Sequence, residues 1–202
     1  MTLALERAAA VTDEHRTDDM EAFFDSFDPP EGYRAELIGG AIVMSPTSVG
    51  LHHVLLHRLT KEFLEAHLPQ GALSTAFPLT VWIPEGVDGD AEGYIPDLVV
   101  ADEGAMLEPG RWKFDPDAVH LAVEVVSKGS QSQRDDRIHK PIGYAAAGVP
   151  LYLLIDPLRR EVTLFAKPED KAYLRKTSVA FGDKIPFPEP FDGVLDTSIF
   201  IT

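Results

Sequence analysis

The pattern of apolar and polar residues predicts a β-hairpin and then a helix in the first third of the chain. In "YRAELIGGAIVMSP" (residues 33–46), two short runs with apolar positions flank Gly39-Gly40, which is typical of a hairpin with a two-residue turn. Residues 51–67 carry apolar side chains at helical spacing. This expected apolar stripe consists of Leu51, Val54, Leu55, Leu59 and Phe63.

Farther along, runs of apolar residues bounded by turn signals predict strands. "STAFPLTVWI" (74–83) suggests a strand that Pro78 would place at a sheet edge or in a bulge. Three further runs are rich in apolar residues and predict buried strands: "YIPDLVVA" (94–101), entered through Pro96, "VHLAVEVVS" (119–127) and "VPLYLLIDP" (149–157). "EVTLFA" and "AYLRKTSVAF" extend the last of them into an antiparallel meander, whereas residues 102–118 and the Pro-rich tail "KIPFPEPFDG" are expected to be irregular.

Two more helices complete the expected architecture. Thr17 can cap a short helix through "DDMEAFFDSF", and residues 131–147 have helical character up to a C-cap at Gly148. Pro141 must either kink this second helix or stand in the first turn of a new one. The predicted fold class is therefore α/β: a mixed sheet flanked by helices with an added antiparallel β-meander, in one domain over 17–202 after a disordered segment 1–16.

Composition narrows the class of protein. The 202 residues are 45% hydrophobic, as in a globular protein, and no apolar run approaches the roughly 18 residues of a membrane span. With no cysteine and no secretion signal, we expect a cytoplasmic protein. The net charge of −15 opposes extended contact with nucleic acid, so any basic surface must be local. Two basic clusters are candidates: Arg134, Arg137, His139 and Lys140, and Arg111 with Lys113.

Two carboxylates stand in otherwise apolar strands. Asp97 precedes Leu98-Val99-Val100, and Glu124 lies within "LAVEVVS". A buried charge is costly unless it is paired or binds a metal ion. If the two strands are neighbours, the carboxylates converge at one sheet edge and suit a hard cation such as Mg²⁺ or Mn²⁺. The alternative for each acid is a buried ion pair with arginine or lysine.

Lys140 is the third candidate group. An ammonium close to a metal-bound phosphate can orient the attacking water or stabilise developing charge. The alternative is an ordinary exposed helix lysine. Pro141 directly after it disfavours helical angles at Lys140, so either of its two placements would move this side chain.

Seven segments in order resemble the Uma-two family of restriction endonucleases, within the PD-(D/E)XK nuclease superfamily. They are "ELIGGAIVMSP", His52, "PDLVVA", "VEVVS", "DRIHK", "YAAAGVP" and "LIDP", and they span about residues 33–165. The resemblance implies an endonuclease-like core and hydrolysis of DNA phosphodiester bonds with Mg²⁺ or Mn²⁺. Asp97 matches the aspartate of the "PD" element and Glu124 the acid of the next strand; both would be catalytic and metal-binding.

The remaining site residues follow from the same resemblance. Val126 stands where the superfamily usually has its lysine, whereas the family takes the lysine from the following helix, where Lys140 stands. Glu36 and His52 match recurrent family positions and are supporting site residues, with His52 a possible proton carrier. The family's Ser-Pro-Ser is Ser127-Lys128-Gly129-Ser130 here, which makes Lys128 a second candidate cation.

Three readings remain open about activity and assembly. A homodimer is plausible, because a small nuclease must reach two strands. The chain could instead be a catalytically inactive nuclease-fold interaction module, since fold does not determine function. His53 and His57, four residues apart on one helix, could chelate zinc, although a third ligand is not evident.

Overall fold

A computed structural model of the chain describes residues 19–47 and 50–201. The expected disorder of residues 1–16 and the capping role of Thr17 lie outside the described residues. Residues 19–26 are helical, as the spacing of Met20, Phe23, Phe24 and Phe27 predicts. None of the described helices is both long and apolar enough to cross a membrane.

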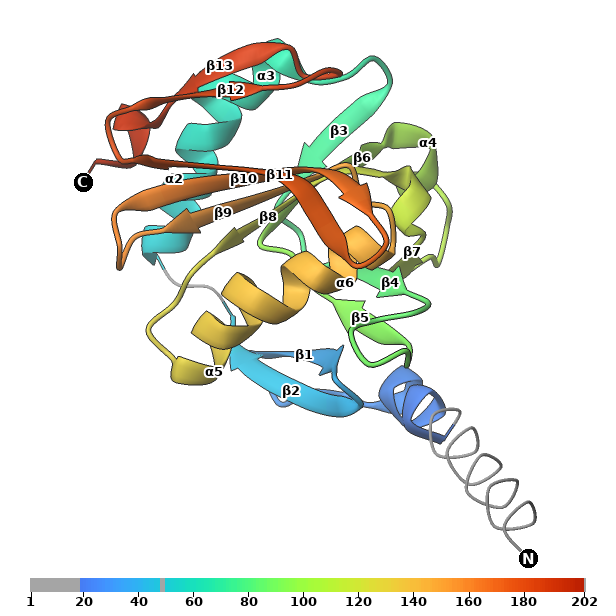
Figure 1. The fold of residues 1–202 in the computed structure, drawn as a ribbon. Coiled ribbons are helices and arrows are strands. Elements are labelled where there is room, and N and C mark those ends of the chain that lie inside the picture. The colour runs from blue at the N-terminus through green and yellow to red at the C-terminus, as the bar shows by residue number, and fades with distance from the viewer. Residues whose placement is uncertain (1–18, 48–49, 202) are drawn as a thin grey trace, which may run out of the picture.

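A six-stranded mixed sheet forms the centre of the molecule (Figure 1). Its strand order is β11-β10-β9-β8-β6-β3, and only β8 and β9 run parallel within it. The bounds are β3 Ala72–Thr75, β6 Leu98–Asp102, β8 Val119–Val125, β9 Leu151–Asp156, β10 Glu161–Glu169 and β11 Ala172–Ala180. The buried strands expected at 119–127 and 149–157 are thus confirmed, as is the antiparallel meander β9-β10-β11.

Both faces of this sheet are covered, which explains why β8 and β9 are apolar at nearly every position. Alternate residues of β8 point to opposite sides. Leu121, Val123 and Val125 pack on one face in the cluster that includes Leu59 and Phe187. Residues of the other parity, such as Ala122, face the cluster that contains Tyr144. Glu124 shares the parity of Ala122 and is therefore directed to the Tyr144 side.

A second sheet of five strands lies beyond that side, in the order β2-β1-β5-β4-β7. The bounds are β1 Tyr33–Ile38, β2 Ala41–Pro46, β4 Thr80–Ile83, β5 Glu92–Tyr94 and β7 Lys113–Phe114. The predicted hairpin β1–β2 is confirmed, with Ile38 paired to Ala41. Gly39 and Gly40 have φ of 57° and 68°, the positive values that a two-residue type I′ turn needs at both central positions.

The expected helix 51–67 is continuous but changes its winding. It comprises α2 (Gly50–Leu59), the π-helical segment η1 (Thr60–Leu64) and α3 (Glu65–His67). Leu55, Leu59 and Phe63 of the predicted stripe are buried, but the first turn, with Leu51 and Val54, is exposed. The prediction that this stripe is buried was therefore wrong for the first turn of the helix, which precedes the part that packs on the sheet.

The second predicted helix also contains a π segment. It runs as α5 (Ser130–Arg134), η3 (Asp135–His139) and α6 (Lys140–Ala146), with Pro141 in the first turn of α6. Pro141 neither starts a separate helix nor takes Lys140 out of helical angles, because His139 (φ −73°, ψ −55°) and Lys140 (φ −59°, ψ −41°) are both helical and only the winding changes from π to α there. Figure 1 shows α6 passing between hairpin β1–β2 and strands β9 and β10. Gly148, at φ 76°, ends the helix as expected, and the Val149 and Gly148 amides donate to the Tyr144 and Ala145 carbonyls.

Prolines divide two segments that were expected to be single strands. Residues 74–83 form β3 and β4 in different sheets, with Pro78 between them. Residues 94–101 divide at Pro96 between β5 and β6, again in different sheets. A proline removes a ladder donor, so the chain leaves one sheet there and enters the other.

Two segments that were expected to be irregular contain regular structure. Residues 102–118 form α4 (Glu103–Met106), β7 and the short helix η2 (Pro116–Ala118). The Pro-rich tail forms the hairpin of β12 (Lys184–Phe187) and β13 (Gly193–Asp196), followed by η4 (Thr197–Phe200). Apolar residues of this hairpin, Ile185, Phe187 and Leu195, join the core, so burial outweighs the proline content.

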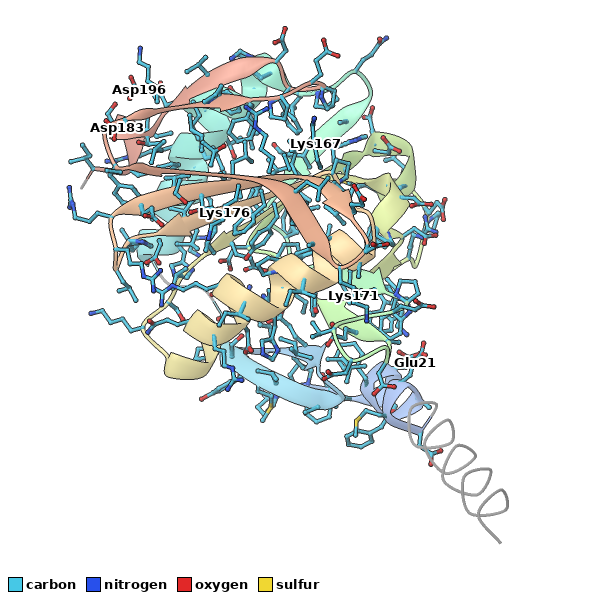
Figure 2. The ribbon with its side chains drawn as sticks, viewed as in Figure 1. Glu21, Lys167, Lys171, Lys176, Asp183 and Asp196 are labelled. Atoms are coloured by element: carbon cyan, nitrogen blue, oxygen red, sulfur yellow. The ribbon has the colours of Figure 1, made fainter. Side chains whose placement is uncertain are left out.

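The turn between β10 and β11 ties the two large sheets together. Lys171, labelled in Figure 2, donates from Nζ to the carbonyls of Gly86 and Val87 at 2.9 and 3.0 Å. These carbonyls belong to the loop between β4 and β5.

The close approach of α6 to β5 gives a test of the packing. A methyl group on Gly143 would overlap the hydroxyl of Tyr94, which is itself fully buried and donates to Glu92. Because Tyr94 has no space to move, we expect Gly143→Ala to lower the free energy of unfolding by about 1–3 kcal/mol in urea titrations. Gly104→Ala, where nothing lies within 4 Å, is the matched control and should be neutral or slightly stabilising. Equal stability of the two variants would contradict this packing.

Candidate active site

Asp97 and Glu124 lie side by side at one end of the central sheet. Strands β6 and β8 are antiparallel neighbours with Leu98 opposite Val123, which places Asp97, just before β6, beside Glu124. The Val125 amide donates to Asp97 Oδ2 at 2.8 Å. Both carboxylates are buried. The expected convergence of these two acids is therefore what the structure shows.

Lys140 reaches the same place from the helix. Its side chain is 1% exposed, and Nζ lies 2.6 Å from Glu124 Oε1 and 2.9 Å from Glu36 Oε1. Asp136, one turn earlier, has Oδ1 at 3.6 Å from the same nitrogen. Lys140 is thus not an exposed helix lysine: its side chain is directed into the interior between α6, β8 and β1.

Glu36 connects this group to the second sheet. It lies on β1, and its Oε1 accepts a hydrogen bond of 2.6 Å from the Ile95 amide. The same oxygen contacts Lys140 Nζ. The supporting position predicted for Glu36 is therefore a direct contact to the lysine, and it links the segment between β5 and β6 to α6.

Arg34 and His52 complete the surroundings of Asp97. Arg34 Nη1 lies 2.9 Å from Asp97 Oδ1, and His52 Nδ1 lies 3.8 Å from Asp97 Oδ2. His52, on α2, is half-buried, so the predicted supporting position is again close to an acid of the site. Lys128, the second candidate cation, is exposed on the loop between β8 and α5, and its carbonyl accepts from Gln133 Nε2.

Two members of the cluster were missed from the sequence. Arg34 lies two residues before Glu36 on β1 and so shares its face. Asp136 lies four residues before Lys140 and so shares its side of the helix. Both spacings can be read from the sequence, but they point to Arg34 and Asp136 only after Glu36 and Lys140 have been recognised as site residues.

The pKa values in the cluster move in opposite directions. Burial would raise the pKa of Asp97, but Arg34 and the Val125 amide stabilise the carboxylate and lower it below the ordinary value. Burial raises the pKa of Glu124 well above its ordinary value despite the contact with Lys140. Burial likewise raises the pKa of Asp136 to about 6. Asp97 is therefore the acid most firmly held as a carboxylate.

The basic groups are also shifted. Burial opposes the charged form of Lys140, but Glu124 and Glu36 outweigh this and raise its pKa. Arg34 shows the same balance, with burial opposed mainly by Asp97, and its pKa is also raised. Burial lowers the pKa of His52, which favours the neutral imidazole.

The donor set and its charge suit a divalent cation. The cluster contains the carboxylates of Glu36, Asp97, Glu124 and Asp136 and only two permanent cations, so full ionisation leaves two uncompensated negative charges. The buried Oε2 of Glu124 has no hydrogen-bond partner. Oxygen ligands of this kind match magnesium or manganese.

No ready-made metal geometry accompanies these donors. Within residues 19–47 and 50–201, no group of three or more histidine and acidic side chains is arranged to hold a metal ion. This holds both for the carboxylate cluster and for the pair His53 and His57. Since Lys140 and Arg34 already contact Glu124 and Asp97, a cation would bind here in competition with them.

A cavity of about 540 Å³ gives access to the cluster. It is bounded by the end of β2, the loop after β8 and the π segment η3. Cluster residues on its wall are Arg34, Glu36, His52, Asp136 and Lys140. The volume falls within the range of roughly 300–1,000 Å³ typical of small-ligand sites.

The central mixed sheet has two acids on adjacent strands and a lysine from the next helix, which is the arrangement that the resemblance to the Uma-two family implies. The family model of Uma2, described as "Putative restriction endonuclease", matches residues 20–198. The chain belongs to this family, which confirms both the sequence resemblance and the predicted fold class.

A solved structure supports the fold independently. It is described as a "putative nuclease belonging to DUF820 from Anabaena variabilis ATCC 29413". The two chains superpose with a TM-score of 0.64 at 19% sequence identity, over 90% of this chain and 96% of that one. No match was found among curated proteins.

The buried lysine gives a direct test of the cluster. Lys140→Met would leave the carboxylates of Glu36 and Glu124 without their cation, so we expect a loss of about 3–5 kcal/mol in the free energy of unfolding. The double variant Lys140→Met/Glu124→Gln should recover part of that loss. Lys61→Met removes an exposed pair with Glu65 and should change stability by less than about 0.5 kcal/mol. If urea titrations give Lys140→Met and Lys61→Met the same free energy of unfolding, the buried ion network is contradicted.

Proposed function

We propose that this protein is a metal-dependent endonuclease that hydrolyses phosphodiester bonds in DNA. The observation that carries the proposal is the buried cluster of four carboxylates, Glu36, Asp97, Glu124 and Asp136, around two permanent cations, Arg34 and Lys140. Full ionisation would leave two negative charges uncompensated, so burial raises the pKa of Glu124 and Asp136, and a divalent cation would stabilise the ionised carboxylates in place of protons. Membership in a family described as restriction endonucleases supports the same activity.

Asp97 and Glu124 would hold the cation, Mg²⁺ or Mn²⁺, with Glu36 beside them. When bound, the cation supplies a lowered pKa for water and stabilises charge on the scissile phosphate and its leaving oxygen. Asp97 is prepared for this role because Arg34 and the Val125 amide keep it ionised. Glu124 has one carboxylate oxygen on Lys140 and the other without a hydrogen-bond partner.

The cationic side chains would orient the substrate. Arg34 lines the access cavity and contacts Asp97, so it can hold a non-bridging phosphate oxygen close to the acids. Lys140 fixes Glu36 and Glu124 and adds positive charge where the phosphate becomes more negative. The neutral imidazole of His52, on the cavity wall, could accept a proton at Nδ1.

A duplex DNA substrate favours a dimeric enzyme. Cutting both strands of a duplex needs two active sites, which a homodimer would supply. The net charge of −15 works against long phosphate contacts by one subunit, so we expect the protein to engage a short stretch of backbone around the cluster.

The activity is tested with supercoiled plasmid and purified protein. We expect nicking with magnesium or manganese and none with EDTA. Asp97→Asn and Glu124→Gln each remove a ligand charge with little change of shape, and should lower the rate by about 100-fold or more. Glu62→Gln, an exposed acid on the helix of residues 50–67, is the matched control and should retain full rate.

The plasmid experiment distinguishes the endonuclease from the inactive interaction module. If both Asp97→Asn and Glu124→Gln still nick the plasmid, the reaction does not take place at this cluster. A folded wild-type protein that leaves plasmid intact with either metal would contradict the endonuclease and favour the inactive interaction module. Unfolding titrations on each variant establish that lost activity is not lost folding.

A further inference from the structure

A second and larger cavity lies beside the access cavity of the carboxylate cluster. Its volume is about 700 Å³, and its walls come from the helix at residues 19–26, the start of β1, α2 and the loop before β7. Its aromatic lining residues are Phe24, Phe27, Tyr33 and Trp112. The proposed hydrolysis does not require this cavity.

Two of these rings offer flat surface that is not buried by the protein. Tyr33 is 46% exposed and Trp112 is 45% exposed, whereas Phe24 behind them is buried. The centroid of the Phe24 ring lies 6.1 Å from that of Trp112 and 6.5 Å from that of Trp82. The cavity thus has a rigid aromatic floor and two accessible rings at its rim.

Ion pairs hold the wall in place. Lys113 Nζ lies 3.1 Å from Glu21 Oε1 and 2.5 Å from Asp25 Oδ1, both on the helix at residues 19–26. Figure 2 labels Glu21 on this helix. Lys113 also lies 3.7 Å above the centroid of the Trp82 ring. These contacts fasten the helix to β7 and keep the aromatic side chains around the cavity.

The cavity adjoins the proposed reaction centre. Asp97 is on its wall, and Arg34 lines both this cavity and the one that leads to Lys140. A group held here would lie next to a phosphate that Arg34 contacts. In a nucleic acid strand, the group attached through the sugar is the base.

We propose that this cavity takes one unpaired nucleobase of the strand whose phosphate lies at the carboxylate cluster. The inference rests on the proposed function and specifies its substrate: a single strand, or a duplex from which a base can leave the stack. Aromatic and apolar surroundings of this type bind bases by stacking, and stacking tolerates any base. At a net charge of −15, few phosphate contacts are available, so base stacking must contribute much of the affinity.

The two tryptophans of the chain allow a binding test that does not depend on cleavage. In a Trp82→Phe variant, Trp112 is the single tryptophan reporter. We expect a single strand of about 12 nucleotides to quench it, in EDTA and in calcium, and the same strand with abasic sites to quench it far less. A fully paired duplex should bind more weakly than a duplex of the same length with a mismatch.

A matched pair of variants locates the base. Tyr33→Ala should weaken binding of the single strand by about tenfold or more. Phe77→Ala, which removes another exposed ring that does not line this cavity, should bind as the wild type does. Equal binding of base-bearing and abasic strands, or equal affinities of the Tyr33 and Phe77 variants, would overturn the inference.

Failure of this inference is distinguishable from failure of the nuclease. Plasmid nicking by wild type with an unchanged rate in Tyr33→Ala would overturn the base-binding cavity and leave the endonuclease intact. Base-dependent quenching by a protein that never nicks DNA would support the cavity and contradict the catalytic proposal.

Discussion

One buried ammonium holds together the parts of the molecule that carry the site. Lys140 Nζ contacts Glu36 on β1, Glu124 on β8 and Asp136 within its own helix, so the two large sheets and the helix between them meet at a single nitrogen. A buried lysine without partners would lose its proton or unfold its surroundings. These contacts join α6 and hairpin β1–β2 to the central sheet, together with the apolar cluster that includes Ile38, Tyr144 and Tyr152.

The sequence indicates the chemistry of this site better than its geometry. Asp97 and Glu124 are conspicuous because charges seldom stand in apolar strands, and the structure brings them together as expected. Pairing between distant strands has no local signal, so the division of residues 74–83 between two sheets could not be seen. The π segment before Lys140 is equally invisible, as is the fact that Lys140 keeps helical angles directly before Pro141. Arg34 and Asp136 can be recognised as members of the cluster only once the side chains of Glu36 and Lys140 are known to meet.

On the proposed function, local electrostatics would let so acidic a chain bind the phosphate of a nucleic acid. Far from the site, the net charge of −15 repels nucleic acid, but Arg34 stands between two cavities and presents positive charge beside Asp97. A divalent cation among the carboxylates would reverse the sign of the field there. On this account, the negative surface limits the length of nucleic acid strand that the protein can bind. The carboxylate cluster would then bind one phosphate of that strand, and the aromatic cavity beside it would bind the adjoining base.

The central claim is that the carboxylate cluster binds a divalent cation, and calorimetric titration of the full chain with Mn²⁺ tests it most directly. We expect saturable binding to the wild type, a loss of about 10- to 100-fold in affinity for Glu124→Gln, and unchanged binding for Glu62→Gln. No heat of binding with folded wild-type protein, or equal affinity in the two variants, would contradict the account and leave the cluster as a structural ion network.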